Sequence, residues 1–239
     1  MSATSNAATS NWQREAEPAP TPRPALRSGH WALGRTLTVL LAGCAGVSGL
    51  KVLLDLYGVL LVSRWKADPS NFLASDGRHF DALTQVFALL GLLVLIPTGI
   101  CTMTWLFQAY GSREADPALL PYRRWWTIGG WLIPFICLVR PFQLMGDLYR
   151  ATAGAPPQEP PVPRAPAPSP LRWWWVCFVI GNVLSNISAR LMVGQTDFGS
   201  QQLSLGLDLV SQLFLIAAAV LFIAVLGLIT TNLRHRASA

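Results

Sequence analysis

The sequence predicts an all-α membrane protein: a polytopic membrane helix bundle with four transmembrane helices and one further Trp-Pro segment that is re-entrant or interfacial. Of its 239 residues, 52% are hydrophobic and 13% are charged, against about 25% charged residues in soluble domains. The mean hydropathy of +0.40 agrees. The chain also contains uncharged windows longer than eighteen residues, which suit a helix whose surroundings cannot form hydrogen bonds with it.

Four apolar runs are long enough to cross a bilayer, at 36–63, 82–110, 173–193 and 204–231. At about 1.5 Å per residue the first run reaches about 42 Å, so it must tilt or project beyond roughly 30 Å of hydrocarbon. Its small residues predict a surface for close helix packing; they are Ala42, Ala45, Gly46, Ser48 and Gly49. In the second run Pro97 predicts a kink, with Thr98 and Thr102 near the freed carbonyl.

A fifth apolar run, 125–139, is too short to be a clear span. It would reach about 22 Å as a helix, it is interrupted by Pro134, and arginines flank it. After Pro141, apolar residues recur at helical spacing between polar ones. This pattern predicts an amphipathic helix that lies at a membrane surface.

The distribution of basic residues decides between four and five spans. If the Trp-Pro segment enters and leaves on one side, thirteen arginines lie on that side, and four basic residues lie on the other: Arg64, Lys66, Arg78 and Arg190. Lys51 is left out because it lies within the first span. The alternative of five transmembrane helices puts eight basic residues on one side and nine on the other, which is no bias. The positive-inside rule therefore favours four spans in a cell membrane, with both termini cytoplasmic.

The chain divides into five parts. Residues 1–29 are polar and proline-rich and predict a disordered cytoplasmic tail. Residues 30–150 hold the first two spans, the Trp-Pro segment and the amphipathic helix. Residues 151–170 contain eight prolines and predict an extended linker, 171–233 hold the last two spans, and 234–239 form a short cytoplasmic tail. In the first loop, Asp68-Pro69 and Asp76-Gly77 predict turns.

Polar residues interrupt the spans in the half that faces outward in this topology. The predicted intramembrane polar cluster is Lys51, Asp55, Asn186, Arg190, Asp208 and Gln212. Lys51 and Asp55 lie one helical turn apart, which predicts a local ion pair. Arg190 and Asp208 flank the last external loop, which predicts a second pair. Such a cluster either holds the helices together or forms a ligand or ion site, and we favour the packing role.

The sequence carries no signature of catalysis. It has no nucleophile–base pair, metal-ligand set, phosphate-binding loop or cofactor motif, and its four cysteines lie in separate apolar runs. We therefore expect no enzyme activity, cofactor or metal. The basic residues lie singly at the ends of apolar runs, which indicates lipid headgroups rather than nucleic acid as partners.

Two functional hypotheses remain. The first is a small non-enzymatic integral membrane protein that interacts with lipids or partner proteins through its cytoplasmic face, as a monomer or a homo-oligomer. The alternative is an ion or small-solute transporter or channel subunit that uses the polar cluster.

A short motif carries a family resemblance. Trp105 is followed, after a polar loop, by Gly130-Trp131-Leu132-Ile133-Pro134 and then by Arg140-Pro141-Phe142-Gln143-Leu144-Met145. This order resembles the bacterial membrane family called domain of unknown function 4328, over residues 35–234. The resemblance implies a multi-span helical protein and no particular activity.

The family likeness also indicates which residues form a structural signature. We expect Trp105, Trp131, Pro134, Arg140 and Pro141 to do so. Arg140 is expected to reach lipid phosphates, and Pro141 to start the amphipathic helix.

The chain departs from the family pattern at two places. The asparagine that follows the proline in the family falls at Cys137, and the asparagine after the second span is missing at 111–114.

Overall fold

The computed structural model describes residues 23–68, 70, 74–133, 135–154, 167–192 and 198–238, and this part of the chain is helical without strands. The elements are α1 (Ser28–Ala67), α2 (Ala74–Tyr110), η2 (Pro117–Leu119), α3 (Trp126–Leu132), η3 (Ile136–Leu138), α4 (Arg140–Ala153), α5 (Ser169–Met192) and α6 (Phe198–Ser238). Four of them, α1, α2, α5 and α6, are long and apolar enough to cross a membrane. The predicted fold class is confirmed.

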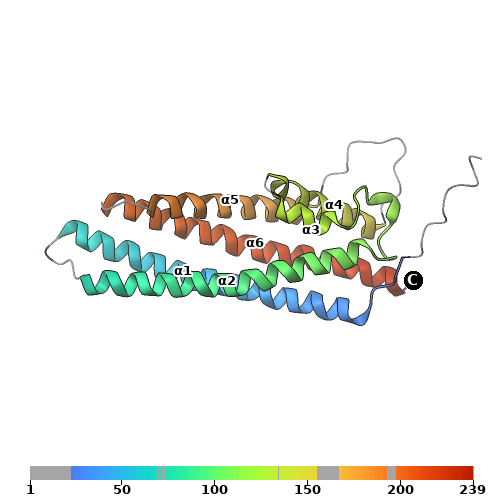
Figure 1. Ribbon diagram of the computed structural model, residues 1–239, viewed down its shortest axis with the longest axis horizontal. Helices are drawn as coiled ribbons and strands as arrows, with labels where there is room; N and C mark the ends of the chain where they lie inside the picture. Colours follow the sequence, from blue (N-terminus) through green and yellow to red (C-terminus); the bar gives the residue numbers. More distant parts are fainter. Residues whose placement is uncertain are drawn as a thin grey trace, which may run out of the picture.

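The long helices lie side by side in the spatial order α2, α1, α6, α5, because α1 packs against α2 and α6, and α6 packs against α5. Figure 1 shows that α1 begins and α6 ends at the same end of the bundle, which we call the terminal end. The short helices α3 and α4 also lie there. The run 125–139 contains only α3 and η3, so it does not cross the bundle, and the five-span alternative is wrong.

The seam between α1 and α6 has a heptad spacing. Buried residues recur every three or four positions in α1 at His30, Gly34, Leu37 and Leu41, and in α6 at Ala218, Phe222, Val225 and Ile229. This spacing keeps one stripe of each helix turned toward the interior of the bundle, where His30 and Gly34 of α1 also meet Trp105 of α2. At 40 and 41 residues, both helices extend beyond the apolar runs that predicted them.

Two of the five small residues that predict close packing of α1 do not lie at a close contact. A Cβ added at Gly46 or Gly49 would meet no heavy atom within 4 Å, so these two positions are open. The close approaches are instead at Gly34, where a Cβ would lie 3.4 Å from Trp105, and at Gly58, where it would lie 2.5 Å from Phe80. The glycines that allow close packing of α1 are therefore those that lie opposite large aromatic rings of α2.

The bend in α2 follows the sequence prediction in part. The helix continues through Pro97, and Figure 1 shows it changing direction in its second half. Thr98 donates its hydroxyl to the carbonyl of Val94 (2.7 Å) and Thr102 donates to the carbonyl of Thr98 (2.7 Å). These hydroxyls lie beside the site of the missing N–H, although Thr98 binds the carbonyl next to the one that proline frees.

The first loop is shorter than its sequence suggests. Asp68 accepts hydrogen bonds from the backbone N–H (3.0 Å) and hydroxyl (2.6 Å) of Ser70, which confirms a turn there. Asp76 and Gly77 lie in the first turn of α2, so the second predicted turn is wrong. An aspartate near a helix N-terminus stabilises the helix, which gives Asp76 a different role.

The two predicted unstructured segments fall largely outside the described residues, which omit 1–22 and 155–166. From Pro24 onward the chain makes specific contacts. The backbone N–H of Arg113 donates to the carbonyl of Pro24 (3.1 Å), and that of Leu26 donates to the carboxylate of Glu114 (3.2 Å). Helix α1 then begins at Ser28, before the predicted end of the tail.

Candidate functional site

The Trp-Pro segment forms a helical hairpin, α3–η3–α4, at the terminal end. Helix α3 ends at Leu132, and the chain then turns back through η3. Phe135 has a φ of 64°, which is uncommon for a residue other than glycine and marks the tight reversal. Pro134 lies outside the described residues. Pro141 lies in the first turn of α4, where its missing N–H removes no helical hydrogen bond, as predicted.

The two arms of the hairpin approach closely at Gly130. A Cβ there would lie 2.9 Å from the Cβ of Arg140, so any side chain would push α3 away from α4. The neighbouring Trp131 packs its ring against the main apolar core. Gly130 therefore allows the close contact between α3 and α4, and Trp131 anchors the hairpin on the core.

Arg140 is held by aromatic rings and an amide. Its guanidinium carbon lies 4.2 Å from the ring centre of Tyr122 and 5.1 Å from that of Trp126. Its Nη1 donates to Oε1 of Gln143 (3.1 Å), which also accepts from the Tyr122 hydroxyl (3.3 Å). These contacts fix the start of α4, and Arg140 stays half-buried, so its expected contact with lipid phosphates remains a prediction.

Helix α4 covers protein rather than an open membrane surface. Its apolar stripe, Leu144, Met145, Leu148 and Ala151, is fully buried in the core at the terminal end. The helix packs on α5 and α6, and Arg236 of α6 donates to the carbonyl of Thr152 (3.0 Å). The amphipathic pattern is confirmed, but the surface that it covers differs from the prediction.

The reversal of the hairpin carries an exposed apolar patch. In the described part it consists of Leu132, Ile133, Phe135, Leu138 and Val139, which we call the apolar tip. Phe135 is 85% exposed and Leu132 is 69% exposed. Water does not favour apolar side chains at this exposure, so the tip is suited to contact with lipid.

The depth of the tip follows from one hydrogen bond. The indole N–H of Trp175 donates to the carbonyl of Leu138 (3.1 Å). Trp175 lies six residues after the start of α5 at Ser169, which corresponds to about 9 Å along the helix. The carbonyl of Leu138 therefore lies beside the second turn of α5, near the terminal end.

Arg124 stands beside the tip on the side of α2. Its Nε donates to the carbonyl of Phe107 (2.9 Å), and its guanidinium carbon lies 3.7 Å from the centre of the Phe107 ring. Partial burial lowers the pKa of Arg124 below its ordinary value, but a guanidinium stays charged at neutral pH. The preceding residue, Arg123, is exposed.

The polar cluster lies toward the opposite end of the bundle. Lys51 forms ion pairs with Asp55, one turn along α1, and with Asp208 of α6 (2.7 Å). Gln212 donates to the second oxygen of Asp208 (3.4 Å). The predicted Lys51–Asp55 pair is confirmed. The predicted Arg190–Asp208 pair is wrong, because Lys51 is the partner of Asp208.

Two members of the predicted cluster lie apart from it. Arg190 is exposed on α5, and Asn186 donates to the carbonyl of Asn182 in its own helix (2.8 Å). The packing face of α5 carries Gly181 and Ser188 instead, both of which are buried. The side chains of α5 that meet α6 are therefore not its most polar ones.

Serines join α5 to α6, and the sequence reasoning missed the two that belong to α6, Ser204 and Ser211. Ser188 donates to the carbonyl of Ser204 (2.8 Å), and Ser204 donates back to the carbonyl of Ser188 (3.0 Å). Ser211 donates to the carbonyl of Gly181 (2.9 Å). Ser204 and Ser211 are seven residues apart on either side of Asp208, and this heptad spacing was the available signal.

Trp105 is a core residue at the terminal end. Its ring is fully buried and stacks on His30, with 5.5 Å between ring centres and 22° between planes. His30 contacts Gln108 through Nδ1 (3.3 Å), which links α1 to α2. The predicted signature residue is thus a packing anchor between the first two helices.

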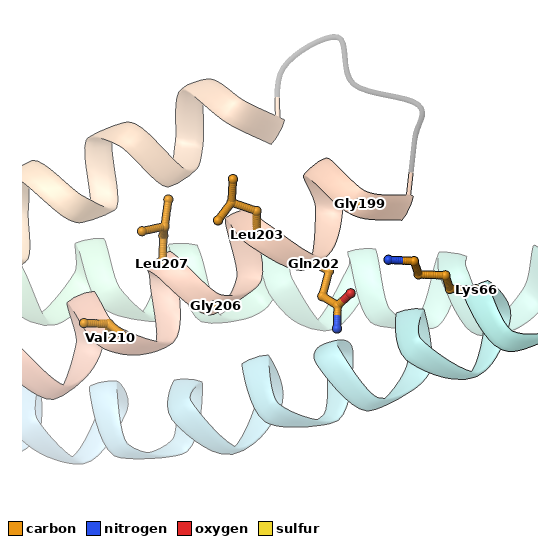
Figure 2. Close-up of a pocket in the computed structure, with 7 residues that line it drawn as sticks. All are labelled: Lys66, Gly199, Gln202, Leu203, Gly206, Leu207 and Val210. Carbon is orange, nitrogen blue, oxygen red and sulfur yellow. The ribbon is translucent and has the colours of Figure 1, made fainter.

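A shallow hollow of about 490 Å³ lies on α6 near the opposite end. Its lining is Lys66, Gly199, Gln202, Leu203, Gly206, Leu207 and Val210. Figure 2 shows Leu203, Leu207 and Val210 along one side of α6 and Lys66 reaching in from α1. The mainly apolar lining suits an acyl chain better than a polar solute.

Within the described residues, no group of three or more His, Cys, Asp or Glu side chains is placed to hold a metal ion. The four cysteines are half-buried and form no disulfide.

These features define a multi-pass α-helical membrane protein with a short helical hairpin at the end where α1 begins and α6 ends. The chain belongs to the family described as domain of unknown function (DUF4328), whose profile matches residues 71–231. The matched region contains the hairpin and the last three spanning helices. No curated protein and no solved structure shows significant similarity to the chain.

Proposed function

We propose that this protein is a non-enzymatic membrane protein that binds lipid at the cytoplasmic face through its re-entrant hairpin. In this proposal the terminal end is cytoplasmic. The thirteen basic residues assigned to that side by sequence agree with this orientation under the positive-inside rule.

The exposed apolar tip is the observation that carries the proposal. A fully buried Phe or Leu side chain gains roughly 1.5–3 kcal/mol relative to water, and several such side chains share the tip. Its level beside Trp175 is consistent with a position at the boundary between headgroups and acyl chains. Trp173 is exposed on α5 at nearly the same level, and tryptophan favours this boundary.

The contacts that hold the hairpin together and on the bundle favour a fixed element over a moving gate. The cation–π contacts of Arg140 and the close approach at Gly130 hold α3 against α4. The buried stripe of α4 holds the hairpin on the bundle. A rigid apolar tip can therefore wedge among lipids of one leaflet without unfolding.

For the polar cluster we propose a packing role rather than transport. Lys51 bridges both carboxylates, which ties α1 to α6 in the half of the bundle away from the terminal end. Asp55 is fully buried, and buried charges that are paired in this way are costly to separate.

A depth measurement tests the proposed function. A nitrobenzoxadiazole label at Phe135→Cys, on a cysteine-free protein in nanodiscs, is expected to be quenched by shallow spin-labelled lipids. Ala153→Cys is the matched control, because Ala153 is exposed at the far end of α4. The control label should stay unquenched by lipid and accessible to aqueous iodide. A label at position 135 that behaves like the control would rule out the proposal.

A further inference from the structure

A second feature of the terminal end is a polar hollow of about 460 Å³. Its lining comes from the segment before α1, the end of α2 and the loop before α3: Arg23, Pro24, Tyr110, Gly111, Leu120, Pro121, Tyr122, Arg123 and Arg124. Three arginines thus line one concave surface. Three segments that are distant in sequence build it.

The arginines of the hollow form no ion pair with an acidic side chain of the described residues. Among the residues that the structure describes, the ion pairs at this end join Arg113 to Glu114 and Arg150 to Asp147, and no lining arginine takes part. Concentrated positive charge in a concave site favours an anion. Guanidinium groups match the planar spacing of phosphate oxygens and bind them with paired hydrogen bonds.

Gly111 leaves the space that the Arg124 side chain occupies in the lining of the hollow. A Cβ at Gly111 would lie 2.6 Å from Nε of Arg124, so a side chain there would displace the guanidinium. Because Nε donates to the Phe107 carbonyl, the terminal nitrogens are the donors left for an anion. The arginine is therefore held in place before any ligand binds.

The hollow continues into apolar surface. The Trp125 ring contacts the Phe107 ring, with 5.4 Å between centres, directly beyond Arg124. Trp125 precedes α3 and is 72% exposed. An anionic group in the hollow therefore lies next to a path along which an acyl chain contacts aromatic rings.

We propose that this hollow binds the phosphate of an anionic phospholipid from the cytoplasmic leaflet, with Arg23, Arg123 and Arg124 as its ligands. This inference rests on the proposed function and gives it a headgroup class. The lipid places its phosphate among the arginines and its acyl chain along Trp125. Free phosphate shares the headgroup chemistry but not the chain.

Binding of short-chain lipids tests the inference. Full-length protein in an uncharged maltoside detergent is titrated with dioctanoyl phosphatidylglycerol, dioctanoyl phosphatidylcholine or inorganic phosphate by calorimetry. The anionic lipid is expected to bind, and the other two are expected to bind at least tenfold more weakly. Arg23→Gln and Arg123→Gln should each weaken binding of the anionic lipid about fivefold, as for one arginine near an anionic surface.

Arg172→Gln is the matched control, since Arg172 is exposed at the start of α5 but does not line the hollow. It should bind the lipid as the unaltered protein does, and all three variants should keep the same melting temperature without lipid. An equal loss in the control, or no loss in Arg23→Gln and Arg123→Gln, would overturn the inference. Inorganic phosphate that binds as tightly as the lipid would also overturn it, in favour of a free-anion site.

The two proposals fail separately. If lipid quenches the label at position 135 but the protein shows no selective lipid binding in micelles, the hairpin proposal stands and the hollow is rejected as its headgroup site. A water-exposed label at position 135 removes the hairpin proposal, whatever the hollow binds.

Discussion

Replacing Lys51 by methionine is expected to destabilise the protein by about 3–5 kcal/mol. The change removes the one cation that contacts both Asp55 and Asp208, and it leaves two carboxylates close together in a buried site. Loss of one partner of a buried ion pair has a cost of this size, because the remaining charge is neither solvated nor paired. Reversible unfolding in mixed micelles of dodecyl sulfate and a maltoside measures the change.

The triple variant Lys51→Met, Asp55→Asn, Asp208→Asn provides the control. It removes all three charges while keeping similar volumes, and neutral replacement of a complete buried ion-pair set is often tolerated. Most of the lost stability should therefore return. A single variant as stable as the unaltered protein would contradict a packing role, and loss of ion flux in vesicles at unchanged stability would point to transport instead.

Trp105→Ala is expected to be the most damaging change in the apolar core, at about 3–5 kcal/mol. The side chain is fully buried, stacks on His30 and packs over Gly34, so its loss leaves a large cavity between α1 and α2. Thermal unfolding followed by circular dichroism in detergent measures the effect as a lower melting temperature.

Trp173→Ala is the matched control for the loss of an indole ring. Trp173 is 61% exposed on α5, so its removal opens no internal cavity. A similar fall in melting temperature for both variants would show that Trp105 is not a packing anchor.

The architecture was predictable because it depends on length and charge. A spanning helix needs about twenty apolar residues, and 125–139 falls short of that number. The concentration of arginines on one side then required the segment to return to that side. The structure agrees, with α1 beginning, α6 ending and the hairpin lying at one end.

The pairing of side chains was less predictable, because the depth of a residue in the membrane does not determine which neighbouring helix its side chain faces. Arg190 was placed at a suitable depth for Asp208, but the packing face of α5 carries Gly181 and Ser188. Lys51 reaches Asp208 because both lie on the seam between α1 and α6. A heptad reading of both helices would have found this pair.

The sequence pattern also could not show which surface covers the amphipathic helix. The apolar stripe of α4 has the period that either protein or lipid contact requires. Only the contacts of Leu144 and Leu148 within the core show that protein covers it. The exposed apolar residues that remain for lipid belong to the reversal around Phe135.

Cysteine accessibility in intact cells tests the four-span account most directly. Ala67 and Ala153 are exposed alanines at opposite ends of the bundle, and each is replaced by cysteine on a cysteine-free background. Ala67→Cys is expected to react with a membrane-impermeant maleimide from outside, and Ala153→Cys only after permeabilisation. Labelling of both from outside would contradict the account, because the Trp-Pro segment would then cross the membrane.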